Sequence, residues 1–118
     1  MKIGIIGAMQ MEVDNLKEAM EHQSVEVVSG ISFVSGKIGE VDVVVAMCGI
    51  GKVFAAICAE AMILKYSPDM VINVGVAGRL TKDLSVLDVA VASVKPEYQS
   101  YDCKYNPRTK TYEYRDMN

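Results

Sequence analysis

The acidic residue best placed to do chemistry is Glu12, which follows the apolar segment 2–7 and the turn Gly7-Ala8-Met9. It falls in the first turn of a predicted helix, where the helix dipole favours the ionised carboxylate. A carboxylate at the edge of a cleft can act as a general base toward water. It can also be an ordinary first-turn glutamate that stabilises the helix, and its position alone leaves both roles open.

Three predicted strands are followed by loops of small residues. The loops are Gly7-Ala8-Met9, Cys48-Gly49-Ile50-Gly51-Lys52 and Gly75-Val76-Ala77-Gly78-Arg79. Ligands of open α/β sheets bind beyond the carboxyl ends of the strands, and small residues let a ligand approach the backbone. Tight turns that simply need glycine are the alternative. If the loops bind a ligand, they meet and hold Glu12 at the mouth of a pocket.

Two familiar glycine motifs are absent from these loops. Gly49-Ile50-Gly51-Lys52 is not a Walker A loop, because Val53 replaces its Ser or Thr. Gly4-Ile5-Ile6-Gly7 lacks the G-x-G-x-x-G spacing, and Gly4 lies inside the strand. Binding of a nucleoside triphosphate or a dinucleotide is therefore poorly supported.

The elements that must position these loops follow from apolar periodicity. The predicted strands are 2–7, 25–28, 31–38, 41–48, 70–75 and 87–93, and the predicted helices are 10–22 and 52–66. This order favours an α/β fold with a mixed central sheet flanked by helices. Two apolar stripes are expected to face the sheet: Met9, Val13, Leu16 and Met20 on the first helix, and Val53, Ala56, Ile57, Ala59, Ile63 and Leu64 on the second. Apolar periodicity is almost absent from 97–118, which is rich in tyrosine, and we predict no element there.

Composition bounds the class of protein. The 118 residues are 51% hydrophobic with a net charge of −3, which indicates a globular domain and argues against nucleic-acid binding. The three cysteines form no C-x-x-C pair and His22 is the single histidine, so we expect no metal site and free thiols. We predict no signal peptide, no membrane span and a cytoplasmic location.

Four ordered motifs resemble those of the 5′-methylthioadenosine/S-adenosylhomocysteine nucleosidases. They are MKIGIIGAMQMEV at the start, CGIGKVFAA from Cys48, PDMVINVGVAGRL from Pro68 and SVLDVAVAS from Ser85. The similarity covers 1–93 in register, and 94–118 is a divergent tail. We therefore describe 1–118 as a partial nucleosidase domain that lacks its C-terminal half.

The resemblance implies a nucleoside phosphorylase-like fold and hydrolysis of the adenine N-glycosidic bond, without a cofactor. It implies that Glu12 activates water for attack on the ribose C1′. By the same analogy Ala8, Met9 and Ile50 line the nucleoside pocket, and the segment Val76, Ala77 and Gly78 contacts the substrate. It also implies a homodimer that binds an adenine nucleoside.

Departures from the family pattern limit this inference. The related phosphorylases place an arginine before the motif that is Asn73-Val74-Gly75 here, so a hydrolase is favoured. Val76 stands where the family commonly has serine, His22 is expected to end the first helix, and Arg79 has no assigned role. The family's second half, which carries the adenine-stacking aromatic, the ribose-binding Met-Glu pair and the adenine-protonating aspartate, is not represented.

We therefore expect this chain alone to be inactive or nearly so, with an open sheet edge or an uncovered apolar face. Two alternatives remain. The chain could be a non-catalytic remnant that dimerises or binds adenine nucleosides, or a purine/uridine phosphorylase-type transferase.

Overall fold

The computed structural model describes the chain except for residues 80, 92–100, 107, 109–110, 117 and 118. It divides into two compact units, residues 1–78 and 79–118. Each unit is described by itself.

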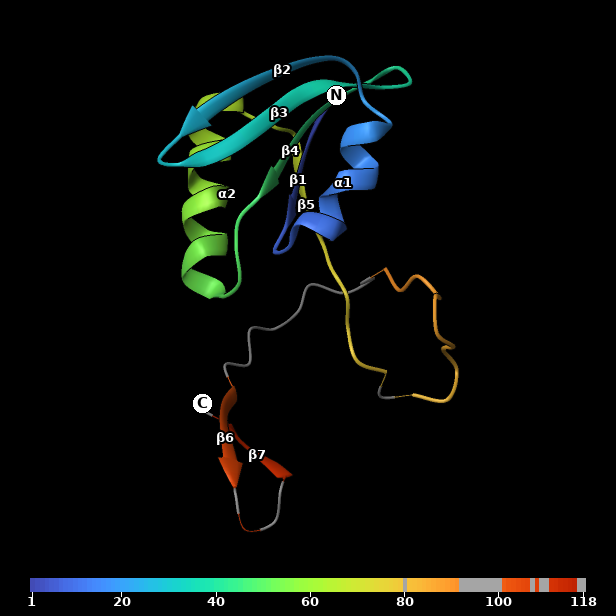
Figure 1. Ribbon diagram of the computed structural model, residues 1–118, viewed down its shortest axis with the longest axis vertical. Helices are drawn as coiled ribbons and strands as arrows, with labels where there is room; N and C mark the ends of the chain where they lie inside the picture. Colours follow the sequence, from blue (N-terminus) through green and yellow to red (C-terminus); the bar gives the residue numbers. More distant parts are fainter. Residues whose placement is uncertain (80, 92–100, 107, 109–110, 117–118) are drawn as a thin grey trace. The chain divides into compact units, whose positions relative to one another are not determined.

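The first unit is a five-stranded mixed sheet with one helix on each face (Figure 1). Its strands are β1 (Lys2–Gly7), β2 (Glu21–Val28), β3 (Ile31–Ile38), β4 (Val41–Met47) and β5 (Met70–Val74), and its helices are α1 (Gln10–Glu18) and α2 (Lys52–Tyr66). The strand order is β2-β3-β4-β1-β5. β1 runs parallel to β4 and β5, whereas β3 is antiparallel to β2 and β4. The predicted α/β class is confirmed.

The core consists of two layers, one on each face of the sheet. Alternate residues of a strand point to opposite faces, so Ile6 packs with Cys58 and Met62 of α2, while Ile5 packs with Val13 of α1. β4 contributes Val44 and Ala46 to the first layer and Val43 and Val45 to the second. Burial on both faces explains the nearly continuous apolar sequences of β1 and β4.

The parallel strands bring three loops to one end of the sheet. Gly7, the last residue of β1, lies opposite Met47 of β4 and Val74 of β5. The amide of Cys48 then donates a hydrogen bond to the Gly7 carbonyl at 2.9 Å. Gly49 has a φ of +89°, a conformation that side-chain-bearing residues rarely adopt. The three glycine-containing turns are therefore neighbours, as the sequence predicts.

The first helix is shorter than predicted. α1 ends at Glu18, and the predicted segment 10–22 is wrong beyond that point because β2 begins at Glu21. The Gln23 side-chain amide donates to the carbonyls of Lys17 and Met20, at 2.6 and 3.0 Å, and so satisfies the end of the helix from within the strand. His22 therefore belongs to β2, with a φ of +53°, and does not end a helix.

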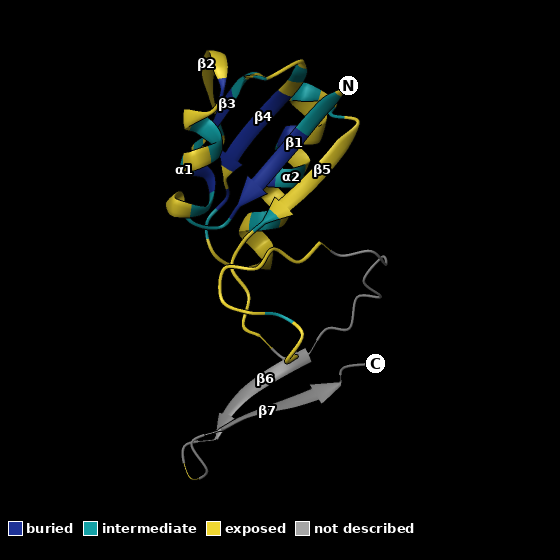
Figure 2. Cartoon of the chain, turned by 90° about the vertical axis from the view of Figure 1, so that its right-hand side faces the viewer, coloured by how far each residue is buried: buried dark blue, intermediate teal, exposed yellow. Residues whose placement is uncertain are grey.

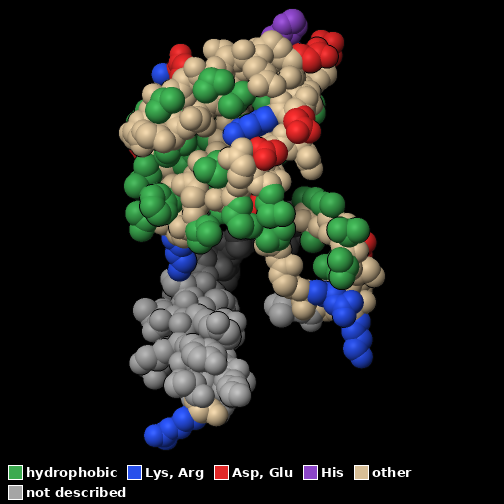
Figure 3. All heavy atoms as spheres, viewed as in Figure 1, with side chains coloured by type: hydrophobic (Ala, Val, Ile, Leu, Met, Phe, Trp, Pro, Cys, Tyr) green, Lys and Arg blue, Asp and Glu red, His purple; other side chains and the backbone are tan. Residues whose placement is uncertain are grey.

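The second helix has the predicted bounds but a different buried side. Cys58 and Met62 are fully buried, with Ala55, Ala59 and Tyr66 packed beside them. Five residues that were expected to face the sheet are exposed: Val53, Ala56, Ile57, Ile63 and Leu64. α2 is apolar nearly all round, so periodicity could not identify the side that packs. Hydrophobic side chains consequently gather on the surface over α2 (Figure 3).

The described part of the second unit includes a β-hairpin, formed by β6 (Tyr101–Asn106) and β7 (Thr111–Asp116). The two strands are antiparallel, with Tyr105 opposite Tyr112. This hairpin was not predicted, although Tyr101, Cys103 and Tyr105 alternate with polar residues at the period of two that marks a strand.

The predicted strand 87–93 is wrong over 87–91, which form no strand. The valine-rich pattern pairs with no strand among the described residues, and Leu87, Val89 and Val91 are exposed. A strand needs a neighbour for its backbone hydrogen bonds, and β-propensity alone does not supply one. Residues 92 and 93 lie outside the described residues.

Candidate functional site

The Glu12 carboxylate joins the loops that follow β1 and β5. Its Oε2 accepts a hydrogen bond from the Met9 amide at 2.9 Å, and its Oε1 accepts one from the Val76 amide at 3.2 Å. The first contact closes the N-terminal turn of α1, where Met9 is the N-cap residue in an extended conformation. The second reaches across the sheet end to a loop 64 residues away in sequence. Glu12 is therefore both a capping residue and a cross-link between two loops.

Small residues make this arrangement possible. A Cβ atom on Gly7 would lie 2.7 Å from Val13 Cγ1, closer than real Cβ contacts allow, and 3.2 Å from Glu12 Cβ, which is a tight contact. A Cβ on Gly75 would lie 3.4 Å from Glu12 Oε1, in ordinary contact. Gly7 thus lets α1 start directly against the end of β1 and sets the position of Glu12.

The Glu12 carboxylate can accept further hydrogen bonds from a bound group. Each carboxylate oxygen has two lone-pair directions, and one backbone donor on each oxygen leaves acceptor capacity for a water or a ligand hydroxyl. Glu12 is half-buried rather than enclosed, so such a group can reach it.

The other predicted site residues occupy the same three loops. Ala8 and Met9 are half-buried between β1 and α1, whereas Ile50 is exposed between β4 and α2. Val76, Ala77 and Gly78 are exposed after β5. Hydrogen bonds join Met9 and Val76 to Glu12. Ile50 lies in the loop after β4, and Ala77 and Gly78 follow Val76 in the loop after β5. Arg79 belongs to the second unit, where its guanidinium donates to the Leu84 carbonyl at 3.0 Å.

Sequence reasoning missed the contact that holds the site together. The side chain of Val76 lacks the hydroxyl of the serine that is common in the family. Val76 contributes to the site through its backbone amide. Any residue except proline supplies that donor, so the replacement of serine by valine leaves the cross-link intact. The strand order, in which β1 lies between β4 and β5, was the missing information.

Two thiols lie in the core layer beneath α2. Cys48 and Cys58 are free and buried, as expected of small hydrophobic side chains. Burial raises the pKa of the Cys58 thiol to about 11 and also raises the pKa of the Cys48 thiol. Cys103 lies in β6, outside the residues whose side chains are described. Within the described part of the chain, no cluster of three His, Cys, Asp or Glu residues could hold a metal.

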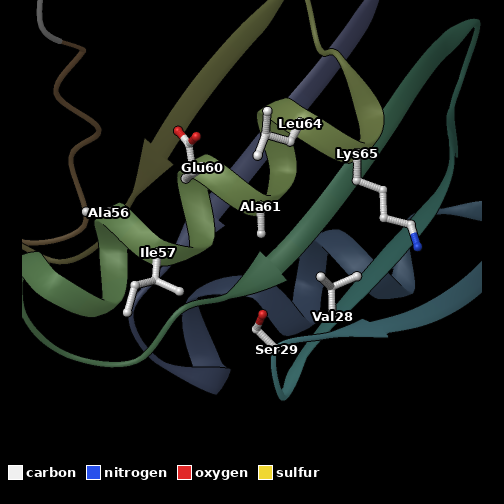
Figure 4. A pocket seen from close by; sticks show the side chains of 8 residues that line it. All are labelled: Val28, Ser29, Ala56, Ile57, Glu60, Ala61, Leu64 and Lys65. Atoms are coloured by element: carbon white, nitrogen blue, oxygen red, sulfur yellow. The ribbon is translucent and has the colours of Figure 1, made fainter.

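A separate apolar groove of about 730 Å³ runs along α2. Figure 4 shows its lining side chains along α2 and at the end of β2. They are Val28, Ser29, Ala56, Ile57, Glu60, Ala61, Leu64 and Lys65. None belongs to the predicted nucleoside site. The described residues include no helix long and apolar enough to cross a membrane.

Similarity to known proteins agrees with this architecture. The chain is 47% identical over 93 residues to the 5′-methylthioadenosine/S-adenosylhomocysteine nucleosidase of Shewanella halifaxensis, covering 79% of this chain and 40% of that protein. The solved nucleosidase of Colwellia psychrerythraea 34H in complex with adenine matches with a TM-score of 0.71 and 41% identity, over 73% of this chain and 36% of that chain.

A second solved nucleosidase, from Neisseria meningitidis in complex with methylthio-immucillin-A, matches with a TM-score of 0.68 and 37% identity, over 71% of this chain and 36% of that chain. The chain thus spans about 40% of the length of the Shewanella relative. The family model of the phosphorylase superfamily matches residues 2–108. The match extends over most of the chain, and the sheet and the three loops agree with it. The chain therefore belongs to the phosphorylase superfamily.

Proposed function

We propose that this chain supplies the water-activating part of a 5′-methylthioadenosine/S-adenosylhomocysteine nucleosidase site. The observation that carries the proposal is the Glu12 carboxylate held between the Met9 and Val76 amides at the carboxyl end of the parallel strands. The names of the similar proteins support the substrate class, and the adenine and methylthio-immucillin-A complexes support an adenine-nucleoside ligand.

In this reaction Glu12 accepts a proton from water as the water oxygen attacks C1′ of the ribose. The bond from C1′ to the adenine nitrogen breaks, and its electron pair leaves with the base. A positioned general base contributes about 10²–10⁴-fold to such a step. Ala8, Met9 and Ile50 line the nucleoside pocket in this proposal, and Val76, Ala77 and Gly78 border the ribose.

Water rather than phosphate is the proposed acceptor. Binding a phosphate oxyanion calls for charge-assisted donors such as arginine. Asn73 and the Gly7-Ala8-Met9 turn provide none, and the guanidinium of Arg79 is engaged with Leu84 in the second unit. The phosphorylase alternative is therefore less well supported than hydrolysis.

Catalysis also needs a proton for the departing adenine and groups that orient the ribose. The resemblance assigns these to a second half that follows the matched part. We propose that 1–93 is the nucleosidase-like portion, that 94–118 is a divergent tail, and that the 118-residue chain alone has little or no activity.

A chimera tests this assignment directly. Residues 1–93 would be joined to the part of the Shewanella halifaxensis nucleosidase that follows its matched segment, and adenine release from methylthioadenosine would be measured. We expect turnover that falls by about 10²-fold or more with Glu12→Gln, and no phosphate dependence. A folded chimera that releases no adenine, or one unaffected by Glu12→Gln, contradicts the proposal.

The proposal includes a homodimer formed through the groove along α2. Its exposed residues Ile57 and Leu64 and the half-buried Ala61 between them recur at the three- and four-residue spacing of a helix-packing stripe. A large exposed apolar patch on a globular unit indicates an association surface.

We also propose a cytoplasmic location, where the free thiols of Cys48 and Cys58 stay reduced.

A further inference from the structure

A polar hollow of about 430 Å³ lies on the α2 side of the sheet, at the end where β1 and β4 begin. Lys2 at the start of β1 lies opposite Asp42 of β4, and both residues line the hollow. Its apolar lining includes Val44 and Tyr66, which are part of the packed layer beneath α2. Because Glu12 follows the opposite end of β1, the hollow is separate from the proposed nucleoside site.

The exposed strand β2 (Figure 2) borders the hollow with a bulge. Its register against β3 shifts between Glu21 and Ser24, and His22 within this bulge has a φ of +53°. Gly36 of β3 makes room for it, since a Cβ there would lie 2.6 Å from the Glu21 carbonyl oxygen. Bulges redirect side chains, and left-handed residues other than glycine cluster at ligand sites.

The bulge places His22 among the residues that line the hollow. No residue in the described part of the chain pairs with its imidazole. A strained backbone that presents an unpaired imidazole to a hollow is a costly arrangement for a surface turn. The arrangement is therefore better explained by a ligand than by the stability of the hairpin.

Two ammonium groups of the hollow keep donors for a ligand. Lys37 Nζ lies 2.9 Å from Asp42 Oδ1, and Lys2 Nζ donates to the Tyr66 carbonyl at 3.0 Å. An ammonium carries three N–H donors, so each of these contacts leaves two donors unused by it. The charged side chains of the lining are thus two lysines and one aspartate, in a chain whose net charge is −3.

We propose that this hollow binds a small phosphorylated molecule that also carries hydroxyl groups. Phosphate oxygens accept their strongest hydrogen bonds from charged donors, which Lys2 and Lys37 supply from two strands beside the His22 imidazole. The second carboxylate oxygen of Asp42 can accept a bond from a ligand hydroxyl. The volume lies within the range of small-molecule sites and leaves room for an organic body beside Val44. This site does not depend on the proposed reaction.

Titration of the 118-residue chain, followed by the NMR shifts of its backbone amides, tests the site. Glycerol phosphate is the probe, and glycerol at the same concentrations is the control. We expect saturable shifts with glycerol phosphate, centred on residues 22–24, 35–37 and 42–44, and none with glycerol. Lys37→Gln should weaken binding about tenfold or more, because hydrogen bonds to charged groups are the strong ones. Lys82→Gln, at an exposed lysine of the second unit, is the matched control and should leave binding unchanged.

His22→Gly separates a ligand role from a structural one. Glycine adopts a positive φ without strain, so the variant should stay folded, with a thermal midpoint close to that of the parent chain. It should nevertheless bind glycerol phosphate about fivefold more weakly.

Absence of saturable shifts overturns the site, as does binding that is insensitive to both Lys37→Gln and His22→Gly. Equal weakening by Lys82→Gln also overturns it, since that result indicates attraction by net charge alone. A lipid headgroup is the other source of a phosphate group. Co-sedimentation with phosphatidylglycerol vesicles, without saturable binding of glycerol phosphate, overturns a soluble ligand.

Discussion

Glu12 Oε1 accepts a hydrogen bond from the Val76 amide at 3.2 Å, although 64 residues separate them in sequence. This contact ties the start of α1 to the end of β5 across the intervening end of β1. It gives Glu12 a structural role that is independent of any reaction, and the two roles predict different responses to substitution.

Glu12→Gln is expected to lower the free energy of unfolding by about 1–2 kcal/mol, because hydrogen bonds to a charged acceptor contribute more than neutral ones. The glutamine amide can also accept only one of the two backbone donors. Urea denaturation of the 118-residue chain measures the change. Glu18→Gln at the end of the same helix, an exposed position, is the matched control and should change stability by less than about 0.5 kcal/mol. Equal effects would contradict a capping role for Glu12.

Gly7→Ala is expected to destabilise the first unit by about 1–3 kcal/mol, since its Cβ would lie 2.7 Å from Val13 Cγ1 in a packed core. The displacement of α1 should also lower the Glu12-dependent turnover of the chimera. Gly78→Ala is the control for stability, because no atom lies within 4 Å of its added Cβ. Thermal unfolding followed by circular dichroism compares them. Unchanged stability of Gly7→Ala would show that α1 is loosely packed.

Leu64→Lys is expected to convert the proposed dimer to monomers without loss of folding, because Leu64 is 73% exposed yet lines the groove along α2. Analytical ultracentrifugation of the 118-residue chain measures the state. Met11→Lys, an equally exposed apolar position on α1, provides the comparison and should leave the dimer unchanged. A chain that is monomeric before substitution, or a dimer insensitive to Leu64→Lys, contradicts this interface.

The buried thiol of Cys58 makes stability depend on alkaline pH. Burial raises its pKa from 9.0 to about 11, so below pH 9 both the folded and unfolded states hold the proton. Between these values the unfolded chain loses the proton first, and the free energy of unfolding falls as the pH rises. The expected loss is on the order of 2 kcal/mol.

Urea denaturation at successive pH values measures this loss. Cys58→Ala should be less stable at neutral pH but should lack that part of the alkaline decline. If the parent chain and Cys58→Ala decline in parallel through this range, the thiol is not the cause.

Much of the first unit could be predicted from local patterns. Apolar runs ended by glycine identified β1, β3, β4 and β5 closely, and Ser67-Pro68 correctly ended α2. Ser67 adopts a left-handed conformation with a φ of +46°, and proline cannot continue the helix. The four motifs located Glu12 and its loops, since a loop's position in the chain is a property of sequence alone.

Other features depended on partners that lie far away in sequence. α2 is apolar on most sides, so only its docking on β1 and β4 decided that Cys58 and Met62 are buried and Leu64 is exposed. Likewise β3 and the Gln23 side chain decided where α1 gives way to β2. The segment 87–91 has strand-forming residues but pairs with no strand in the described part of the chain.

The sequence by itself determined that Glu12 opens a helix directly after a short buried strand and a glycine turn. Only the tertiary structure decided that the Val76 amide holds the carboxylate, and that β5 is the last strand of the first unit's sheet, with Met70, Val71 and Ile72 exposed. The physical reason is that hydrogen bonds between strands and contacts between loops are set by strand order, and no local pattern of residue types encodes that order.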